Sequence, residues 1–232
     1  MSLKNIKVNS PTYRVIVPSN KKEVNISPLK VRDEKILLIA AESKDEKQLI
    51  DSIKTVITNS VEGEEISNLT SYDVEYLFLR IRAISVGETA EVSLKCSECE
   101  TANGVKIDLT TVNVKNIENF KTSIKVTDDL MFQMGAPSLD DYVGVEETAD
   151  GLTKFLASNV RQVYSGEEVF DVTSTDIDDV VGIMDQLTSD QFMNIQQYVE
   201  TMPRLSHDVE YDCEHCGKHN EITIQGLSNF LS

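Results

Sequence analysis

The sequence has no long run of apolar residues. The richest stretch, residues 36–41, is far shorter than the roughly 18 residues that a membrane helix needs. The first residues, Met1 to Lys4, contain no apolar core that would serve as a secretion signal. We therefore expect a soluble intracellular protein that makes no contact with membranes.

Residues that carry catalysis are also scarce. Tryptophan is absent, and the three histidines, His207, His215 and His219, all lie near the end of the chain. This leaves no separate histidine for a Ser-His-Asp or Cys-His arrangement. The sequence contains neither the phosphate-loop pattern G-x-x-x-x-G-K-[ST] nor the dinucleotide-binding pattern G-x-G-x-x-G. We therefore expect a protein that is not an enzyme and takes no small-molecule substrate.

Positive charge is low: 22 Lys and Arg stand against 39 Asp and Glu, a net charge of −17. A field of this sign does not attract nucleic acid. Residues 138–190 hold thirteen of the acids and two bases, whereas residues 1–54 hold eleven bases and seven acids. This acidic block is either a solvated helical surface or a face that docks on a basic partner.

The opening third of the chain predicts a β-hairpin followed by helices. Alternating apolar residues at 13–17 and 24–26 flank a Pro-Ser-Asn turn, which favours a hairpin. Residues 35–41 fit either a buried strand or the start of a helix. A helical apolar period follows at 49–57, and a second one from about Ser71 to Ser85.

Capping patterns predict where three helices begin. Ser43 with Glu46 predicts a start near Lys44, and Thr70 with Asp73 predicts the next start. In the later part of the chain, Thr188 and Gln191 form the same pattern.

Residues 138 to about 202 predict a helical region with several separate apolar stripes. Its apolar stripes include Val163, and Pro203 ends the last helix. The expected class is α+β, with an N-terminal hairpin and helices. We expect three regions: 1–115, then 116–205 as a mixed-strand and mainly helical acidic insertion, and 206–232.

All four cysteines lie in two Cys-x-x-Cys pairs, Cys96/Cys99 and Cys213/Cys216. In both copies a valine stands four residues before the pair, an asparagine four after it and an isoleucine four beyond that. Apolar alternation on both sides of each pair predicts strand, turn and strand. The chain thus contains an internal repeat whose copies stand 117 residues apart.

This spacing predicts a structural zinc site. Two thiolates on one tight turn bind a single zinc at about 2.3 Å, and two such turns complete a tetrahedron. We predict one zinc per chain, bound by Cys96, Cys99, Cys213 and Cys216. Four sulfur ligands leave no open coordination position, so no water is activated. The two turns would form a split zinc ribbon, with 116–205 inserted between its halves.

Other uses of the cysteines remain open. Two disulfides are disfavoured in a reducing cytosol, and a redox Cys-x-x-Cys belongs at a strand-to-helix junction. The hairpins can also persist in a chain that has lost its metal, and His215 or His219 can replace a cysteine ligand.

The alternative function is that of a zinc ribbon that binds nucleic acid. Residues 95–100 and 212–218 are close to neutral or acidic, and no surface of interleaved aromatic and basic residues is evident. We therefore expect no contact with nucleic acid.

Three segments, in the same order, resemble a known family. Leu29–Leu38 (LKVRDEKILL), preceded by Val17-Pro-Ser-Asn, resembles the opening of the baseplate hub proteins of T-even-type contractile-tailed bacteriophages. Tyr72–Glu88 (YDVEYLFLRIRAISVGE) is similar to the next block of that family, and it leads into the first cysteine pair and then Val105–Leu109. The likeness covers roughly residues 11–135, is weaker in the acidic block, and returns at the closing cysteine pair.

The resemblance implies a phage morphogenesis protein without enzymatic activity. Its partners would be other proteins of the tail and baseplate hub. Its place would be the tail baseplate of the virion, assembled in the host cytoplasm. Either a permanent hub component or a hub assembly factor fits this likeness.

Overall fold

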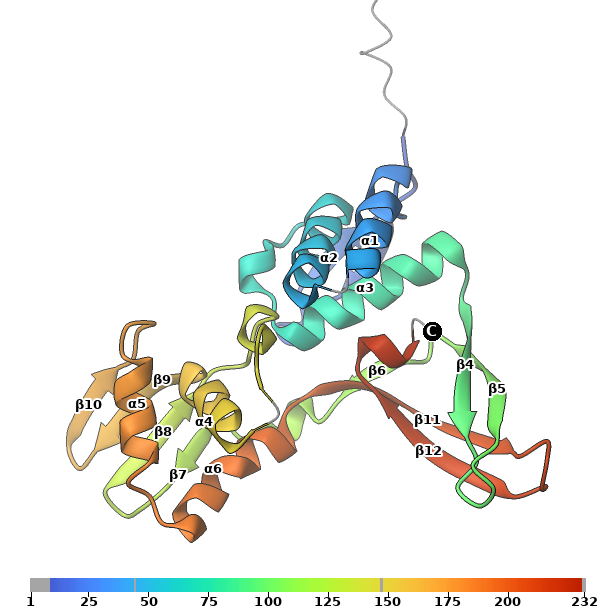
Figure 1. Cartoon of the computed structure of the whole chain (residues 1–232). Helices are drawn as coiled ribbons and strands as arrows, with labels where there is room; N and C mark the ends of the chain where they lie inside the picture. The colour runs from blue at the N-terminus through green and yellow to red at the C-terminus, as the bar shows by residue number, and fades with distance from the viewer. Residues whose placement is uncertain (1–8, 44, 147, 231–232) are drawn as a thin grey trace, which may run out of the picture.

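The computed structural model describes residues 9–43, 45–146 and 148–230, which fold into six α-helices and small antiparallel sheets (Figure 1). The helices are α1 Val31–Ser43, α2 Glu46–Ser60, α3 Ser71–Val86, α4 Ala149–Ser158, α5 Ile177–Met184 and α6 Ser189–Thr201. Short 3₁₀ turns are η2 Ile66–Asn68, η3 Ile117–Asn119, η4 Asp140–Tyr142 and η5 Leu227–Phe230. No helix within the described ranges has the length and apolar character needed to cross a membrane. The predicted α+β class is confirmed.

The strands form four separate sheets, ordered β1-β2-β3, β4-β5, β12-β11-β6 and β10-β9-β8-β7. The first six strands are β1 Tyr13–Ile16, β2 Glu23–Ile26, β3 Val61–Glu62, β4 Thr89–Lys95, β5 Ala102–Asp108 and β6 Asn113–Lys115. The others are β7 Ser123–Lys125, β8 Leu130–Met134, β9 Val160–Ser165, β10 Glu168–Asp171, β11 Arg204–Asp212 and β12 His219–Gln225. All pairs are antiparallel, and the predicted N-terminal hairpin is present as β1 and β2.

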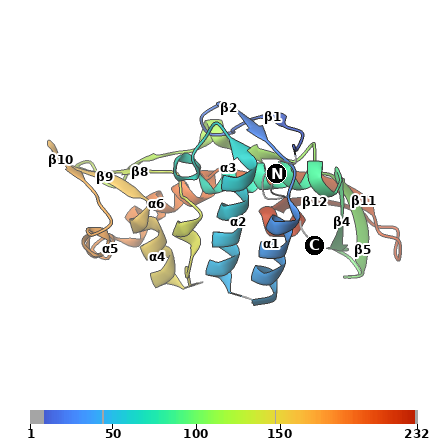
Figure 2. The ribbon, with the colours of Figure 1, turned by 90° about the horizontal axis from the view of Figure 1, so that it is seen from above.

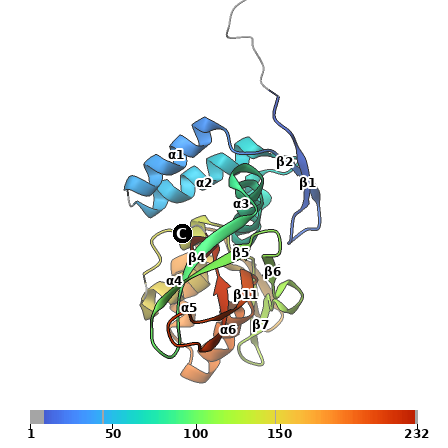
Figure 3. The same ribbon diagram turned by 90° about the vertical axis from the view of Figure 1, so that its right-hand side faces the viewer.

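The first of two hydrophobic cores gathers both ends of the described chain around α3. Leu77, Leu79 and Ile81 of α3 are fully buried in it. The β1-β2-β3 sheet and α2 cover one side of this helix (Figures 1 and 3). The β4-β5 hairpin follows its C-terminal end, and β11 passes along its other side (Figure 1). Residues before 113 and after 204 therefore share one core, although about 90 residues separate them in the sequence.

The second core lies between the β10-β9-β8-β7 sheet and helices α4, α5 and α6. Its centre holds Phe132, Leu156, Ile195 and Tyr198, all fully buried. The Tyr198 hydroxyl donates a hydrogen bond to the Gly135 carbonyl (2.7 Å), so its polar end is satisfied inside the core. In Figure 2 this body lies at the opposite end of the molecule from the two cysteine-bearing hairpins.

The strands that enter and leave the second core are neighbours. β6 pairs with β11 in the register Lys115↔Arg204, and both belong to the sheet that carries the second cysteine pair. Residues 116–203 therefore begin and end at adjacent points of one sheet. The predicted division into three regions stays a prediction.

Two of the three predicted capping boxes are confirmed. These are Thr70/Asp73 and Thr188/Gln191. In each, the threonine hydroxyl accepts a hydrogen bond from the backbone N–H of the second residue, and the side chain of that residue accepts one from the threonine N–H. The Ser43/Glu46 box is wrong: Ser43 ends α1, with its hydroxyl bonded to the Ala40 carbonyl (2.7 Å). Asp45 caps α2 instead, because its carboxylate accepts from the Gln48 N–H (3.0 Å). The predicted start at Lys44 lies outside the described residues.

Two expectations for secondary structure are resolved differently. Residues 35–41, which fitted a strand or a helix, belong to α1. The helical region expected over 138–202 is interrupted by β9 and β10, so Val163 is a strand residue that packs into the second core. The chain reverses at Gly166, whose φ of +59° suits glycine, and this turn joins the two strands. The segment is therefore a mixture of sheet and helix.

Many acids of the block 138–190 occupy the first turns of helices. Asp150 lies in the first turn of α4, Asp178 and Asp179 in that of α5, and Asp190 in that of α6. Carboxylates are favourable there because the exposed N–H groups give a helix N-terminus partial positive charge. This placement accounts for part of the negative charge as helix stabilisation.

Candidate metal centre

Each cysteine pair lies in the turn of an antiparallel hairpin, as the sequence predicts. Cys96 and Cys99 lie between β4 and β5, and Cys213 and Cys216 lie between β11 and β12. The strands close at Lys95↔Ala102 and at Asp212↔His219, again with the offset of 117 residues. The two hairpins come from different sheets and meet at their tips (Figure 1).

The two turns repeat each other bond by bond. The Cys96 N–H donates to the Thr101 carbonyl (3.0 Å), and the Cys213 N–H donates to the Lys218 carbonyl (2.8 Å). In the first turn the fifth residue is Glu100, whose N–H donates to the Cys96 carbonyl (3.0 Å).

The fifth position of the second turn is Gly217, whose N–H donates to the Cys213 carbonyl (2.8 Å). Both fifth residues have left-handed backbone, with φ of +57° at Glu100 and +71° at Gly217. Glycine adopts this conformation without strain, whereas glutamate does not.

The four sulfurs form one compact cluster. The Sγ atoms of Cys96 and Cys216 are 3.7 Å apart, and those of Cys99 and Cys213 are 3.6 Å apart. All four lie within 4.8 Å of one another. Zinc–sulfur bonds of about 2.3 Å in a tetrahedron require sulfurs about 3.8 Å apart, which these cross-hairpin pairs match. A disulfide requires about 2.05 Å, and the four cysteines are free thiols.

Two buried asparagines link the hairpins through reciprocal hydrogen bonds. The Asn220 side-chain oxygen accepts from the N–H (2.9 Å) and the hydroxyl (2.8 Å) of Ser97 in the opposite turn. The Asn103 side-chain oxygen accepts from the N–H of Glu214 in the other direction (3.0 Å). The sequence repeat marked both asparagines but did not predict this role. Their equal spacing from the cysteines was the signal that pointed to it.

The backbone of the turns favours ionised sulfur. The N–H groups of Cys99 and Glu98 lower the pKa of Cys96 to about 6, and those of Cys216 and His215 lower the pKa of Cys213. At Cys216 the Lys218 N–H acts in the same direction, but the neighbouring thiols, Cys99 first, raise its pKa to about 12. Crowded sulfurs that cannot all ionise unaided are suited to a divalent cation, which supplies the missing positive charge.

No histidine side chain belongs to the described four-sulfur group, and His219 has a partner of its own. His219 is about half exposed, and its Nδ1 atom lies 2.8 Å from an Asp212 carboxylate oxygen, which raises the pKa of the imidazole. Among the described residues, the group placed to hold a metal consists of the four cysteines alone. All four ligands would come from the protein, so the centre suits a structural ion and offers no open position for chemistry.

Comparison with known proteins identifies the family. The family model described as "T4 bacteriophage base plate protein" matches residues 10–232, which include both cores and all four cysteines. No curated protein and no solved structure gives a significant match to the chain. The match covers nearly the whole chain, and the resemblance found in the sequence is confirmed. The chain therefore belongs to the T4 bacteriophage base plate protein family and has a structural role in the phage tail baseplate.

Proposed function

We propose that this protein is a non-enzymatic component of the baseplate hub, or a factor that assembles the hub, and that it acts by binding other tail proteins. The observation that carries the proposal is the family match over residues 10–232. The match includes the hairpins at one end of the molecule and the second core at the other, so both parts of the fold belong to the matched region.

The four-cysteine cluster supports a structural zinc as part of this function. The donors are soft thiolates, their cross-hairpin spacing fits a tetrahedral ion, and the two turns are already joined by Asn103 and Asn220. The ion would complete a split zinc ribbon and fix the angle between the two hairpins. Its function would be to stiffen a body that other proteins bind.

The structural roles of two adjacent carboxylates, Asp140 and Asp141, support the absence of catalysis. Asp140 forms an ion pair with Lys54, and Asp141 accepts hydrogen bonds from the Ser138 N–H (2.7 Å) and hydroxyl (2.9 Å). Asp140 and Asp141 thereby anchor the segment between the two cores, and their carboxylates are engaged by Lys54 and Ser138. Their interactions are those of structural residues.

The test is baseplate assembly in infected cells. A phage with a stop codon early in the gene for this protein should accumulate hub-deficient tails or baseplate precursors. Supply of the intact chain should restore complete baseplates. Mass spectrometry of purified virions then separates a hub component, which is retained, from an assembly factor, which is not. Complete baseplates formed without the protein would refute the proposal.

A further inference from the structure

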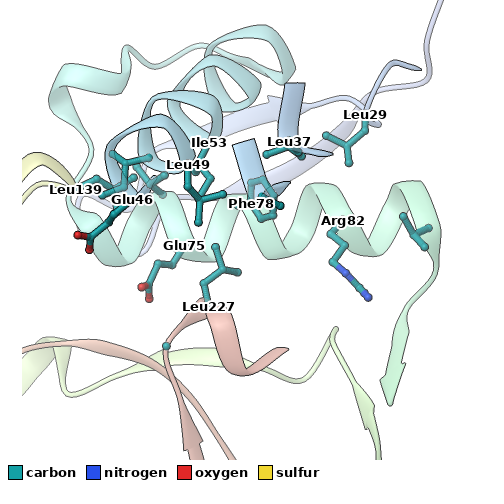
Figure 4. Close-up of a pocket in the computed structure, with 15 residues that line it drawn as sticks. Leu29, Leu37, Glu46, Leu49, Ile53, Glu75, Phe78, Arg82, Leu139 and Leu227 are labelled. Atoms are coloured by element: carbon teal, nitrogen blue, oxygen red, sulfur yellow. The ribbon is translucent and has the colours of Figure 1, made fainter. Parts of the chain in front are cut away.

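An apolar groove runs along α3 in the first core, away from the cysteine cluster. Helix α3 forms its floor, α1 and α2 form one wall, and η5 forms the other (Figure 4). Its volume is about 550 Å³. The floor residues run from Val74 to Val86, a distance of about 18 Å along a helix.

The groove exposes apolar side chains that the rest of the described chain does not cover. Val86 is 70% exposed and Leu49 is 39% exposed, and both line the groove. Beside the groove-lining Leu37, the α1 residues Leu38 and Ile39 are more than 60% exposed. A helix that is apolar on several faces is normally covered on those faces. Here α1 packs along α2 and leaves the remainder open (Figure 3).

Three charged residues line the same groove without an ion pair among the described residues. Glu46 and Glu75 lie toward one end and Arg82 toward the other, with Leu227 between them (Figure 4). The buried Arg82 Nη1 atom also has no hydrogen-bond acceptor in the described ranges. Buried donors are nearly always paired, so this end of the groove lacks an acceptor.

These features define the chemistry of an occupant. A bound segment must satisfy its own backbone hydrogen bonds, because α1, α2 and α3 supply most of the lining and a helix offers no free backbone edge. This requirement favours a helix. A floor of about 18 Å accommodates about three helical turns. Glu46 and Arg82 lie toward opposite ends of the groove (Figure 4), so their partners would be opposite charges toward the two ends of the bound helix. A second copy of this chain is disfavoured because each copy carries a net charge of −17.

We propose that this groove is the docking site for an amphipathic helix of another baseplate protein. The helix would place an apolar stripe against Leu49 and Val86, a lysine or arginine near Glu46, and an acidic residue near Arg82. The inference rests on the proposed function, since it takes the partner from the same assembly.

Site-specific photocrosslinking in the intact assembly tests this docking site. The full chain, with p-benzoylphenylalanine in place of Leu49, is produced in cells infected with the phage, and the crosslinked residues are identified by mass spectrometry. The matched control carries the same amino acid at Met193. This residue is 60% exposed on the outer face of α6, a helix that packs against the second core. The expected adduct at position 49 joins a helical segment of another baseplate protein with the stated stripe and charges.

Added charge in the groove should remove this adduct. Val86→Lys should lower the yield at position 49 at least about tenfold, because a lysine would have to be desolvated by an apolar helix. Met193→Lys should leave the yield unchanged, and equal melting temperatures of the two variants would exclude loss of folding as the cause.

Several outcomes would overturn the inference. They are an adduct with a second copy of this chain, an adduct with nucleic acid or lipid, an adduct with a segment that lacks the apolar stripe, or no adduct although the chain sediments with baseplate precursors. If the chain sediments with no baseplate protein at all, the proposed function itself fails and the docking site fails with it.

Discussion

Removal of the proposed zinc should release the two cysteine-bearing hairpins from each other while the second core stays folded. The perturbation is a chelator, or the substitutions Cys96→Ser and Cys213→Ser, each of which removes one sulfur from the same cluster. Because the two turns are equivalent in their backbone bonds, both substitutions should destabilise the protein by the same amount within about 1 kcal/mol.

The magnitude follows from the chain that the ion would cross-link. Cys96 and Cys213 are 117 residues apart, and the chain-entropy relation for a cross-link of that length gives about 5 kcal/mol. Zinc in finger peptides contributes about 10–16 kcal/mol. Natural domains have total stabilities of about 5–15 kcal/mol. Loss of the ion should therefore cost at least about 5 kcal/mol, enough to separate the hairpins.

Hydrogen exchange with mass spectrometry measures this effect region by region. Chelation should speed exchange in β4, β5, β11 and β12, which flank the cysteines, and should leave β8 and β9 in the second core protected. Elemental analysis should give about one zinc per chain before chelation and none after it. Full protection of all four hairpin strands in metal-free protein would refute the reasoning, as would a large effect of one cysteine substitution and none of the other.

Three further predictions concern strain, polar contacts and pH. Glu100→Gly should stabilise the protein by about 0.5–1 kcal/mol because it relieves left-handed strain, and Gly217→Glu should destabilise it by a similar amount in thermal melts. Asn220→Ala should cost about 1 kcal/mol more than Asn103→Ala in urea unfolding, because Asn220 accepts two hydrogen bonds across the hairpins and Asn103 accepts one. Burial raises the pKa of Glu75 from 4.5 to about 7, so the folded state holds a proton that the unfolded state has released, and stability should fall as pH rises from 4.5 to 7. Glu75→Gln should flatten this dependence and recover up to about 3 kcal/mol at pH 8, and an unchanged pH profile would contradict the assignment.

Local features of the fold could be predicted because single residues determine them. Thr70 and Asp73 form a reciprocal cap that needs no partner from elsewhere in the chain, and the hairpins around the cysteines follow from alternation over a few residues. The start of α2 was misassigned because Ser43 and Asp45 both resemble caps, and only the backbone path shows which side chain reaches the Gln48 N–H.

Other features depend on contacts between distant residues and had no local signal. The β9-β10 hairpin was hidden in an acidic block whose apolar residues also fit a helical period, although Ser165-Gly166 is a turn signal that would have revealed it. The pairing of Lys115 with Arg204 cannot be read from either segment alone. The cysteine cluster was predictable because the repeat itself linked its two halves, whereas the groove along α3 is formed by four elements and has no sequence pattern.

The register Lys115↔Arg204 has a consequence for the evolution of the chain. Because these residues are cross-strand partners, deleting everything between them would leave two ends that a short hairpin turn can rejoin. A gene encoding this protein can therefore lengthen, shorten or exchange the intervening residues while the remaining part keeps its connectivity.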